Sequence, residues 1–421
     1  YPDINFKHSN FPDYIKAIKE KVPNDLAVVK GELTSQDTDG WSTLINCASS
    51  HIYLKQMNRK CESALENGAE PVRVLSSVLG QNYPSDELEY SWKKLMQNHP
   101  HDSICCCSVD EVQDEMATRF NKSKQVADYL VSEGTRYIAD KINTKEYEKY
   151  KNALPFVVFN TTGRKRTSVV SVEIDVTRKS GWLKKCAYDL DEINVPNYKL
   201  IDSAGNSIPF KIEDLGVRFG YDLPKDKFRQ PYMARRVRVT FEAENISAVG
   251  YKTYALVEGD AEKVTDTLVS GENCMENDAI RVEINKNGSL NVTDKASGRT
   301  YKGVAYYEET GDLGNEYMYK MPEGSKAITT QDTVAKIELA EDEPYRAMYK
   351  ITNTITVPKS GDDNFEDEKR HMVFFKERVG GRSNDTVEMK IETFVSLDKN
   401  GKGVKIKTRF DNEVKDHRVR I

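Results

Sequence analysis

The sequence has no long apolar segment, and none of its runs approaches the roughly 18 apolar residues that a membrane-spanning helix needs. The first ten residues, YPDINFKHSN, contain neither a start methionine nor the apolar core of a signal peptide. Concentrated positive charge is absent as well, because 62 basic and 67 acidic residues are mixed along the chain and leave a net charge of -5. We therefore expect neither a membrane nor a nucleic acid as a partner.

Cysteines are few and do not form a disulfide pattern. Their number, seven, is odd, and three of them are adjacent, at Cys105, Cys106 and Cys107. Secreted disulfide-bonded domains use even numbers of spaced cysteines, so the pattern favours a reducing compartment, and we expect a cytoplasmic protein. The chain begins with Tyr1 and ends on an apparent strand, HRVRI, and we expect it to be a fragment of a longer protein.

The length of 421 residues predicts several domains, because single cores rarely grow beyond about 250 to 300 residues. Near the start, the stretches INFKHS, NFPDYIKAIKEKV and LAVVKGEL have the patterns of a strand, a helix and a buried strand. Together they are one step of a parallel sheet, which cannot form a domain by itself. Residues 1–40 are therefore predicted to be the tail of a parallel α/β domain.

Between residues 41 and 148 the hydrophobic period is helical. Residues 49–80 predict a long helix, kinked near Gly68 and Pro71. A second helix is predicted after Pro84, and three helices with short connections predict an antiparallel bundle.

The predicted helix starts rest on local capping signals. Ser85 is expected to cap the second helix, and Ser108, followed three residues later by Glu111, has the spacing of a capping box for the third. The residues expected to face the core are Leu88, Trp92, Leu95 and Met96 in the second helix and Val109, Val112, Met116, Phe120, Ala127 and Leu130 in the third.

From residue 149 onward the apolar residues recur with period two, which is typical of one-sided antiparallel strands. Asn287-Gly288 predicts a hairpin turn. A small β-sandwich domain is expected in residues 149–260 and the start of a larger, truncated one in residues 261–421, on either side of the charged stretch VEGDAEKVTDT. The alternating residues are Val170, Val172, Ile174 and Val176; Val237, Val239 and Phe241; Val387, Met389, Ile391, Thr393, Val395 and Leu397; and Val404, Ile406 and Phe410.

The stretch QNHPHDSICCCSVDEV, residues 97–112, places polar and sulfur-containing side chains in a turn between two predicted helices. His101 offers an imidazole that can bind a divalent metal. The carboxylate of Asp102 can coordinate the metal, orient the ring or accept hydrogen bonds from sugar hydroxyls. A solvated turn with an incidental histidine explains the same residues, so the pattern alone leaves both interpretations open.

The three adjacent cysteines are better explained as packed side chains than as a metal-binding or reactive site. Successive residues of a turn point in different directions, and structural zinc sites use spaced pairs such as C-x2-C with a second pair elsewhere. We expect small buried side chains that close the start of the bundle. A nucleophilic cysteine with His101 as its base is the alternative, although no third orienting group is indicated. Two other histidines are less informative: His8 is interpreted as a capping or site residue and His417 as a surface or interdomain residue.

The segment from Leu95 to Met116, LMQNHPHDSICCCSVDEVQDEM, closely resembles a segment of the bacterial family 38 glycoside hydrolases, the α-mannosidases, that usually reads N-x-x-H-D-S-I-C-G-C-S-x-D-E-V-H. The resemblance continues upstream through VVKGEL and SSHIYLKQMNRK. Downstream it continues through MENDAIRVEINKNGSLNVTDKASGRTY, GDLGNEYMY and DNEVKDHRVRI, in the family's order. It covers essentially the whole chain.

The resemblance implies an N-terminal catalytic α/β domain, a three-helix bundle and β-sandwich domains. It implies that His101 completes a zinc site, with one ion whose other ligands come from the catalytic domain, and that Asp102 contacts hydroxyls of a bound mannose. Retaining glycoside hydrolysis needs a carboxylate nucleophile and an acid/base about 5 Å apart. The family places both in the N-terminal domain, so no catalytic residue is expected in this chain and the chain alone is expected to be inactive.

Two residues depart from the family pattern. Cys106 stands where glycine is usual, and if that position requires a positive φ, the cysteine costs on the order of 1 kcal/mol or more. Gln113 stands where histidine is usual, which removes or alters any supporting task of that histidine.

The sequence therefore predicts part of a zinc-dependent retaining α-mannosidase that hydrolyses terminal α-mannosidic bonds of mannose-containing oligosaccharides or mannosyl glycosides. A bacterial cytoplasmic location and a homodimer are compatible with the resemblance. The alternative is a non-catalytic carbohydrate-binding or scaffold fragment in which the turn is inert. An upstream H-x-D metal motif and a later nucleophilic aspartate would decide for the enzyme.

Overall fold

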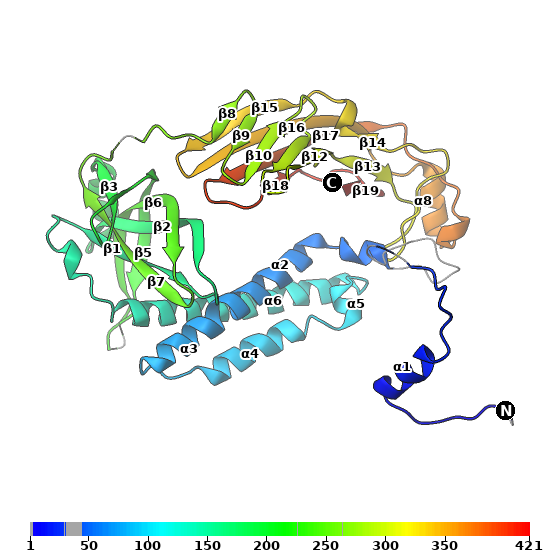
Figure 1. Ribbon diagram of the computed structural model, residues 1–421, viewed down its shortest axis with the longest axis horizontal. Coiled ribbons are helices and arrows are strands. Elements are labelled where there is room, and N and C mark those ends of the chain that lie inside the picture. The colour runs from blue at the N-terminus through cyan, green and yellow to red at the C-terminus, as the bar shows by residue number, and fades with distance from the viewer. Residues whose placement is uncertain (1–2, 29, 31–43, 225, 263) are drawn as a thin grey trace.

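The computed structural model describes residues 3–28, 30, 44–224, 226–262 and 264–421 (Figure 1). A helical unit comes first, followed by a β unit that packs at one end of the helices and a second β unit that lies above them in Figure 1. All described strand pairings are antiparallel. Within the described residues, no helix is both long and apolar enough to cross a bilayer.

The first segment contains one isolated helix, α1 (Phe11–Lys19), which stands apart from the rest in Figure 1. Asn10 caps it by accepting a hydrogen bond from the backbone of Asp13 at 3.0 Å, so His8 is not the cap. The two strands predicted beside this helix are wrong wherever the structure describes them; residues 29 and 31–33 of the second lie outside the described residues. A parallel strand needs a neighbour for its backbone hydrogen bonds, and none lies alongside within this part of the chain.

The long kinked helix predicted for residues 49–80 is confirmed. It consists of α2 (Ile52–Ala64), a π-helical turn η2 (Leu65–Ala69) and α3 (Glu70–Val78). Pro71 has no N–H for the regular helical ladder, so the chain widens into the π turn just before it. At Gly68 an added β-carbon would lie only 2.9 Å from Val131, so the glycine allows close packing at the kink.

The next helices are α4 (Ser85–Met96), the one-turn helix α5 (His101–Ile104) and α6 (Asp110–Ala139). Both predicted serine caps are wrong, because α4 is preceded by Pro84 and α6 by Val109, neither with a side-chain cap. The hydroxyl of Ser108 instead donates to the carbonyl of Asp102 at 3.0 Å. A hydrogen bond within the turn has therefore replaced the capping box.

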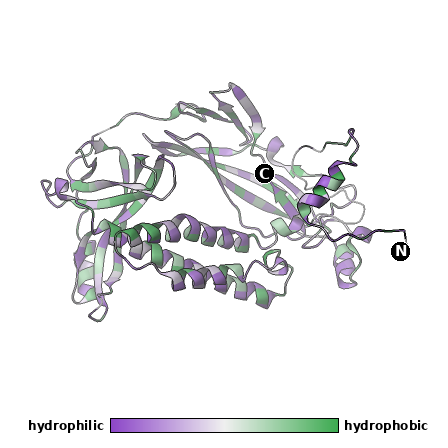
Figure 2. Ribbon diagram, turned by 60° about the horizontal axis from the view of Figure 1, so that its bottom comes forward, coloured by the Kyte–Doolittle hydropathy of each residue, from purple (hydrophilic) through white to green (hydrophobic). Residues whose placement is uncertain are grey.

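The helices pack with α6 against α2, α3 and α4, and their apolar faces meet inside the unit (Figure 2). Of the predicted core residues, Met96 and Val109 are exposed, because they lie at helix ends that no neighbour covers. The bundle core consists of Leu54, Cys61, Leu65, Ala69, Leu88, Leu95, Cys106, Met116, Phe120, Ala127 and Leu130.

The first β unit has two sheets whose apolar faces pack together. Their orders are β1-β7-β3-β4 and β2-β6-β5. Val237, Val239 and Phe241 of the central strand are fully buried between them, as the alternation predicts. The elements are η3 (Lys145–Tyr147), β1 (Leu154–Asn160), β2 (Arg166–Lys179), α7 (Leu183–Asp191), β3 (Tyr198–Asp202), β4 (Ser207–Ile208), β5 (Phe210–Asp222), β6 (Gln230–Ile246) and β7 (Gly250–Glu258).

The second β unit contains three sheets, ordered β12-β11-β10-β9-β8, β15-β16-β17-β18 and β14-β13-β19. Its first strands are β8 (Val269–Gly271), β9 (Cys274–Glu276), β10 (Ile280–Ile284), β11 (Leu290–Asp294), β12 (Arg299–Val304), β13 (Glu308–Gly311) and β14 (Ile328–Thr329). The others are η4 (Thr330–Asp332), β15 (Lys336–Glu343), β16 (Arg346–Pro358), α8 (Asp363–Arg370), η5 (Phe375–Glu377), β17 (Thr386–Asp398), β18 (Lys405–Arg409) and β19 (His417–Arg420).

Two predictions for this unit have different outcomes. The hairpin turn at Asn287-Gly288 is confirmed, with Gly288 at φ +84° between β10 and β11. Ile406 and Phe410 were predicted to continue a buried face, but both are exposed. They lie on and after β18, which is an edge strand, so one side of the sheet leaves them uncovered.

Candidate functional site

The turn with His101 and Asp102 lies at the end of the helical unit, where α5 joins α4 to α6 (Figure 1). Pro100 precedes α5, and its fixed φ suits the start of a helix. The side chain of His101 is 90% exposed and that of Asp102 is 69% exposed. The Nε2 atom of His101 lies 3.4 Å from Oδ1 of Asp102. The two side chains thus form an adjacent, solvent-facing pair of an imidazole and a carboxylate.

The backbone beneath this pair is fixed by hydrogen bonds to Asp102. Its carbonyl oxygen accepts from the hydroxyl of Ser108 at 3.0 Å, the backbone N–H of Cys107 at 3.3 Å and the thiol of Cys107 at 3.4 Å. The same thiol lies 3.7 Å from the carboxylate oxygen Oδ1. These contacts tie α5 to the start of α6, so the backbone that carries the exposed pair is fixed in position.

Cys106 has φ +65°, the left-handed conformation that glycine adopts at no cost. This confirms the sequence-based expectation for a position where the family usually has glycine. The side chain is 3% exposed and belongs to the bundle core, and its Sγ accepts a hydrogen bond from Nζ of Lys55 at 3.0 Å. The cysteine is therefore strained in its backbone but packed through its thiol.

The other departure from the family pattern, Gln113, is buried on α6. Its amide donates to the carbonyl of Ser108 at 3.3 Å, while its carbonyl oxygen Oε1 has no partner among the described residues. Its side chain thus holds the residues that lead from the turn into α6. The neighbouring Asn98 makes a similar contact, donating to the carbonyl of Met116 at 3.1 Å.

A segment from the second β unit contacts the residues before α2, at the start of the helical unit. Asn46, in the 3-10 turn η1 (Ile45–Ala48), donates to the carboxylate of Asp312 at 2.8 Å and to the carbonyl of Asn315 at 2.9 Å. The neighbouring Cys107 raises the pKa of the Tyr317 phenol to about 12. The stretch GDLGNEYMY carried the family resemblance, but nothing in its pattern predicted this contact.

The described residues can supply part of a metal site. Within the described ranges, no group of three or more His, Cys, Asp or Glu side chains is arranged to hold one. His101 presents an exposed imidazole, which is a ligand that zinc accepts. A zinc ion bound there needs further ligands from residues outside those ranges.

The two other histidines singled out in the sequence lie away from this turn. His8 is exposed in the segment before α1. The side chain of His417 is 5% exposed and lies within the second β unit, where its Nδ1 lies 3.2 Å from Glu309 and its Nε2 lies 2.9 Å from Asn412. The interpretation of His417 as a surface or interdomain residue is therefore wrong, because β19 pairs with β13 and places the ring beside the buried Glu309.

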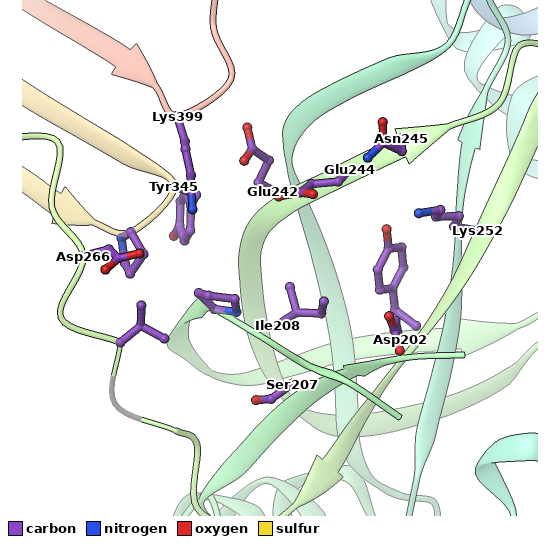
Figure 3. A pocket seen from close by; sticks show the side chains of 14 residues that line it. Asp202, Ser207, Ile208, Glu242, Glu244, Asn245, Lys252, Asp266, Tyr345 and Lys399 are labelled. Carbon is purple, nitrogen blue, oxygen red and sulfur yellow. The ribbon is translucent and has the colours of Figure 1, made fainter. Parts of the chain in front are cut away.

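A separate pocket of about 310 Å³ lies between the two β units (Figure 3). Glu242 of β6 is its buried carboxyl, and burial raises the pKa of this group. Asn400 of the second β unit donates to Glu242 at 2.8 Å, so the pair joins the two units. The pocket is lined by Asp202, Ser207, Ile208, Pro209, Glu242, Glu244, Asn245, Lys252, Tyr254, Val264, Asp266, Pro344, Tyr345 and Lys399, none of which belongs to the turn.

Two family profiles match the chain. The profile described as the alpha mannosidase middle domain matches residues 42–138, which is the helical unit. The profile described as glycosyl hydrolases family 38 C-terminal domain 1 matches residues 151–258, which is the first β unit.

Similar proteins extend the match over the whole chain. A protein of Halalkalibacterium halodurans named "Putative mannosylglycerate hydrolase" is 40% identical over 435 residues, which is 100% of this chain and 47% of that protein. The crystal structure of an alpha-mannosidase from Enterococcus faecalis V583 superposes with a TM-score of 0.87 at 40% identity, covering 100% of this chain and 48% of the other.

A second crystal structure, of a glycosyl hydrolase family 38 protein from Enterococcus faecalis, gives a TM-score of 0.84 at 37% identity and the same coverage, 100% and 48%. The chain thus spans about half the length of these relatives. Within that half it has the helical middle domain and the antiparallel sheets that follow it. The chain belongs to glycosyl hydrolase family 38, the α-mannosidase family, and corresponds to the middle and C-terminal regions of its members.

Proposed function

We propose that this chain is the middle and C-terminal part of a zinc-dependent retaining α-mannosidase. His101 supplies one zinc ligand, Asp102 binds hydroxyls of the mannose, and the nucleophile and the acid/base come from the remainder of the enzyme. The observation that carries the proposal is the exposed, adjacent pair of His101 and Asp102 on α5, 3.4 Å apart, above a backbone tied by three hydrogen bonds.

The chemistry of the pair agrees with this division of labour. When bound, the zinc ion supplies a positive charge that polarises ligand oxygen atoms. The carboxylate of Asp102 accepts hydrogen bonds from sugar hydroxyls, and such charge-assisted bonds are among the strongest that a protein makes. Among the described residues, the weak thiol donor of Cys107 and the imidazole of His101 approach only one of its oxygen atoms, Oδ1, so the carboxylate keeps most of its capacity to accept.

The backbone contacts give the pair its positioning role. Binding groups contribute most when they are held in place before the ligand arrives, because no free energy is then spent on ordering them. The bonds from Ser108 and Cys107 hold the carbonyl of Asp102, and Gln113 holds the carbonyl of Ser108. The helical unit therefore acts as the rigid support for one wall of the sugar site.

The substrate proposed is a mannosyl glycoside with a terminal α-linked mannose. The Halalkalibacterium halodurans relative is named for mannosylglycerate, so an α-mannosyl group on glycerate is one substrate to test beside mannose-containing oligosaccharides. In a retaining mechanism the anomeric configuration of the product equals that of the substrate, because two inversions occur in succession.

The test compares the 421-residue chain with a longer protein that carries the family's N-terminal region in front of it. An aryl α-mannoside and α-mannosylglycerate are assayed with added zinc. We expect turnover with release of α-mannose in the longer protein and none above the blank in the chain alone. Turnover by the chain alone would contradict the division of labour. If the longer protein binds mannose without turnover, the non-catalytic carbohydrate-binding alternative holds.

A further inference from the structure

The pocket between the two β units is lined by residues that the proposed function does not use. Its volume of about 310 Å³ lies at the lower end of the range for small-molecule sites, which begins near about 300 Å³. Glu242 and Glu244 line it from β6 of the first β unit, whereas Tyr345 and Lys399 line it from the second (Figure 3). A molecule bound in this pocket therefore contacts both units.

A buried tyrosine hydroxyl in this pocket lacks a hydrogen-bond partner. Tyr345 lies in the turn between β15 and β16 and is only 2% exposed, yet its hydroxyl has no donor or acceptor among the described residues. Such a buried hydroxyl costs free energy unless something supplies the missing bond. Because Tyr345 lines the pocket, a ligand there can supply it.

A second buried tyrosine lines the same pocket from the first β unit. Tyr254 of β7 is also 2% exposed, and burial raises the pKa of its phenol to about 12. Burial likewise raises the pKa of the Tyr345 phenol. Both side chains are therefore neutral hydroxyls at physiological pH, and each can donate one hydrogen bond and accept another.

The rest of the pocket interior is apolar or already hydrogen-bonded. Ile208 and Pro209 supply apolar surface. The buried carboxyl of Glu242 accepts hydrogen bonds from the backbone and the side-chain amide of Asn400, at 3.4 and 2.8 Å. A ligand that enters the pocket thus meets two neutral hydroxyls, apolar surface and one carboxyl that already has its partners.

Charged side chains of both signs surround this interior. Glu244, Asp266, Lys252 and Lys399 line the pocket and are exposed. The two lysines oppose a simple cation, and the carboxylates oppose a simple anion. Within the described ranges, moreover, no cluster of three or more His, Cys, Asp or Glu side chains could hold a metal ion. A neutral ligand with several hydroxyl groups can accept from the lysines and donate to the carboxylates.

We propose that the pocket between the two β units is a binding site for a neutral sugar, either a monosaccharide or one unit of an oligosaccharide. The hydroxyls of Tyr254 and Tyr345 bind the sugar in the interior, and the exposed lysines and carboxylates bind it at the rim. Each β unit supplies one of the tyrosines, so the sugar holds the two units together. That the sugar is a mannoside rests on the proposed function, whereas its chemical class does not.

Saturation-transfer NMR of the 421-residue chain tests the proposal with methyl α-mannoside and methyl α-glucoside as probes. A ligand of this size in a small polar pocket is expected to bind with a Kd on the order of 1 mM, which suits this method. Spermidine and glycine are tested in the same way as a cation and a zwitterion. The proposal is overturned if neither sugar receives saturation at about ten times that concentration, or if only the charged probes do.

Asp102→Asn separates this pocket from the sugar contact proposed at the turn. In this variant the contact at the turn is weakened, and we expect a sugar signal to remain because none of the pocket residues belongs to the turn. Complete loss of the signal would place the sugar at the turn and overturn the pocket site. A retained signal supports the pocket site even if the proposed function fails.

Tyrosine variants in the Asp102→Asn chain then identify the hydroxyls. Tyr345→Phe removes a hydroxyl that has no partner in the free protein, so the melting temperature should stay equal or rise, while the affinity for the sugar should fall about 3- to 10-fold. The double change Tyr254→Phe and Tyr345→Phe should abolish the remaining signal. Tyr188→Phe, on the exposed face of α7, is the matched control and should alter neither property. An affinity that survives the double change would overturn the proposal.

Discussion

The side-chain amide of Asn46 donates a 2.8 Å hydrogen bond to the carboxylate of Asp312, across 266 residues of sequence. The same carboxylate accepts the backbone N–H groups of Gly314 at 2.8 Å and Lys320 at 3.0 Å. It therefore organises the loop that follows β13 and attaches it to the start of the helical unit. Burial raises the pKa of Asp312, because it disfavours the charged carboxylate. The three hydrogen-bond donors offset part of that desolvation cost.

Replacing Asn46 should loosen this loop. Asn46→Ala removes a hydrogen bond to a charged group, which contributes about 1.5 to 3 kcal/mol, so the amides of Gly314 and Lys320 should exchange with solvent roughly 10- to 100-fold faster. Hydrogen exchange followed by mass spectrometry measures this. Unchanged exchange in both amides would show that the loop is held by its own turn alone.

Asn46→Asp should be worse than Asn46→Ala at neutral pH, because it sets a second carboxylate beside a buried one. A carboxyl whose folded pKa is raised stabilises the fold most when it is protonated, below its unfolded pKa of about 3.9, and this contribution is lost as the pH rises through the folded pKa. The difference between the two variants should therefore shrink as the pH falls toward about 4. Thermal unfolding at both pH values measures it, and an equal difference at both would contradict the expectation.

Cys106 allows the cost of a left-handed backbone to be separated from the value of a buried thiol. Cys106→Ala loses the thiol and its contact with Lys55 but keeps the β-carbon at φ +65°. Cys106→Gly loses the thiol and the strain together. The glycine variant should therefore be more stable than the alanine variant by about 1 kcal/mol, and close to the unaltered chain. Urea unfolding of the three proteins measures this, and equal stability of both variants would mean that the backbone is not strained.

The buried carboxylate of Glu309 should make the second β unit sensitive to acid. Burial by itself would raise the pKa of Glu309, but hydrogen bonds from His417 and Arg382 outweigh it and hold the pKa below its usual range. The Arg382 contacts are 2.6 and 2.8 Å, and both side chains are almost fully buried. A depressed carboxyl pKa stabilises the fold above the unfolded pKa, and this stability is lost as the pH falls through the folded value.

Glu309→Gln should accordingly destabilise the protein by about 3 to 5 kcal/mol at neutral pH, because Arg382 is left buried without a counter-charge. The loss should diminish as the pH falls through the lowered pKa of Glu309, because the carboxylate of the unaltered protein is then protonated as well. Urea unfolding at several pH values measures it. The matched control is Glu338→Gln, whose partner Lys336 is exposed, and this change should leave stability nearly unaltered. An equal effect of both substitutions would contradict the special role of burial.

Local signals in the sequence predicted the structure correctly where one or two residues determine the backbone conformation. Pro71 interrupts a helix and Asn287-Gly288 makes a hairpin turn whatever surrounds them, and both were found where predicted. Ser108 has the right spacing for a cap, yet its hydroxyl bonds to the carbonyl of Asp102, because a backbone acceptor earlier in the same turn competed successfully with the helix start.

Contacts between distant segments could not be predicted in this way. His101 and Asp102 were singled out by residue type and resemblance, but the contacts of Asn46 with Asp312 and of Cys47 with the carbonyl of Glu316 join segments about 270 residues apart. The spacing of hydrophobic residues along the sequence carries no information about such contacts. The described parts of the strands predicted in residues 1–40 do not form strands for a related reason, since a strand pattern forms a strand only where a partner strand is present.

The exposed pair on α5 gives the decisive test of the proposed function, in the longer protein that carries the family's N-terminal region. His101→Ala should lower both bound zinc and activity severely, because removing one of the protein ligands weakens zinc binding strongly. Asp102→Asn should keep most of the zinc and lose kcat/KM, because an amide cannot accept charge-assisted hydrogen bonds from sugar hydroxyls.

Zinc content by elemental analysis and kcat/KM for both variants separate the two roles. His99→Ala is the matched control, since His99 lies two residues before His101 and contacts Asn58 at 2.8 Å. It should retain zinc and most of the activity. If His101→Ala keeps full zinc content and near-normal turnover, the imidazole is not a ligand and α5 serves only to connect α4 with α6. If instead Asp102→Asn loses zinc together with His101→Ala, the carboxylate is itself a ligand and its proposed role toward the sugar is wrong.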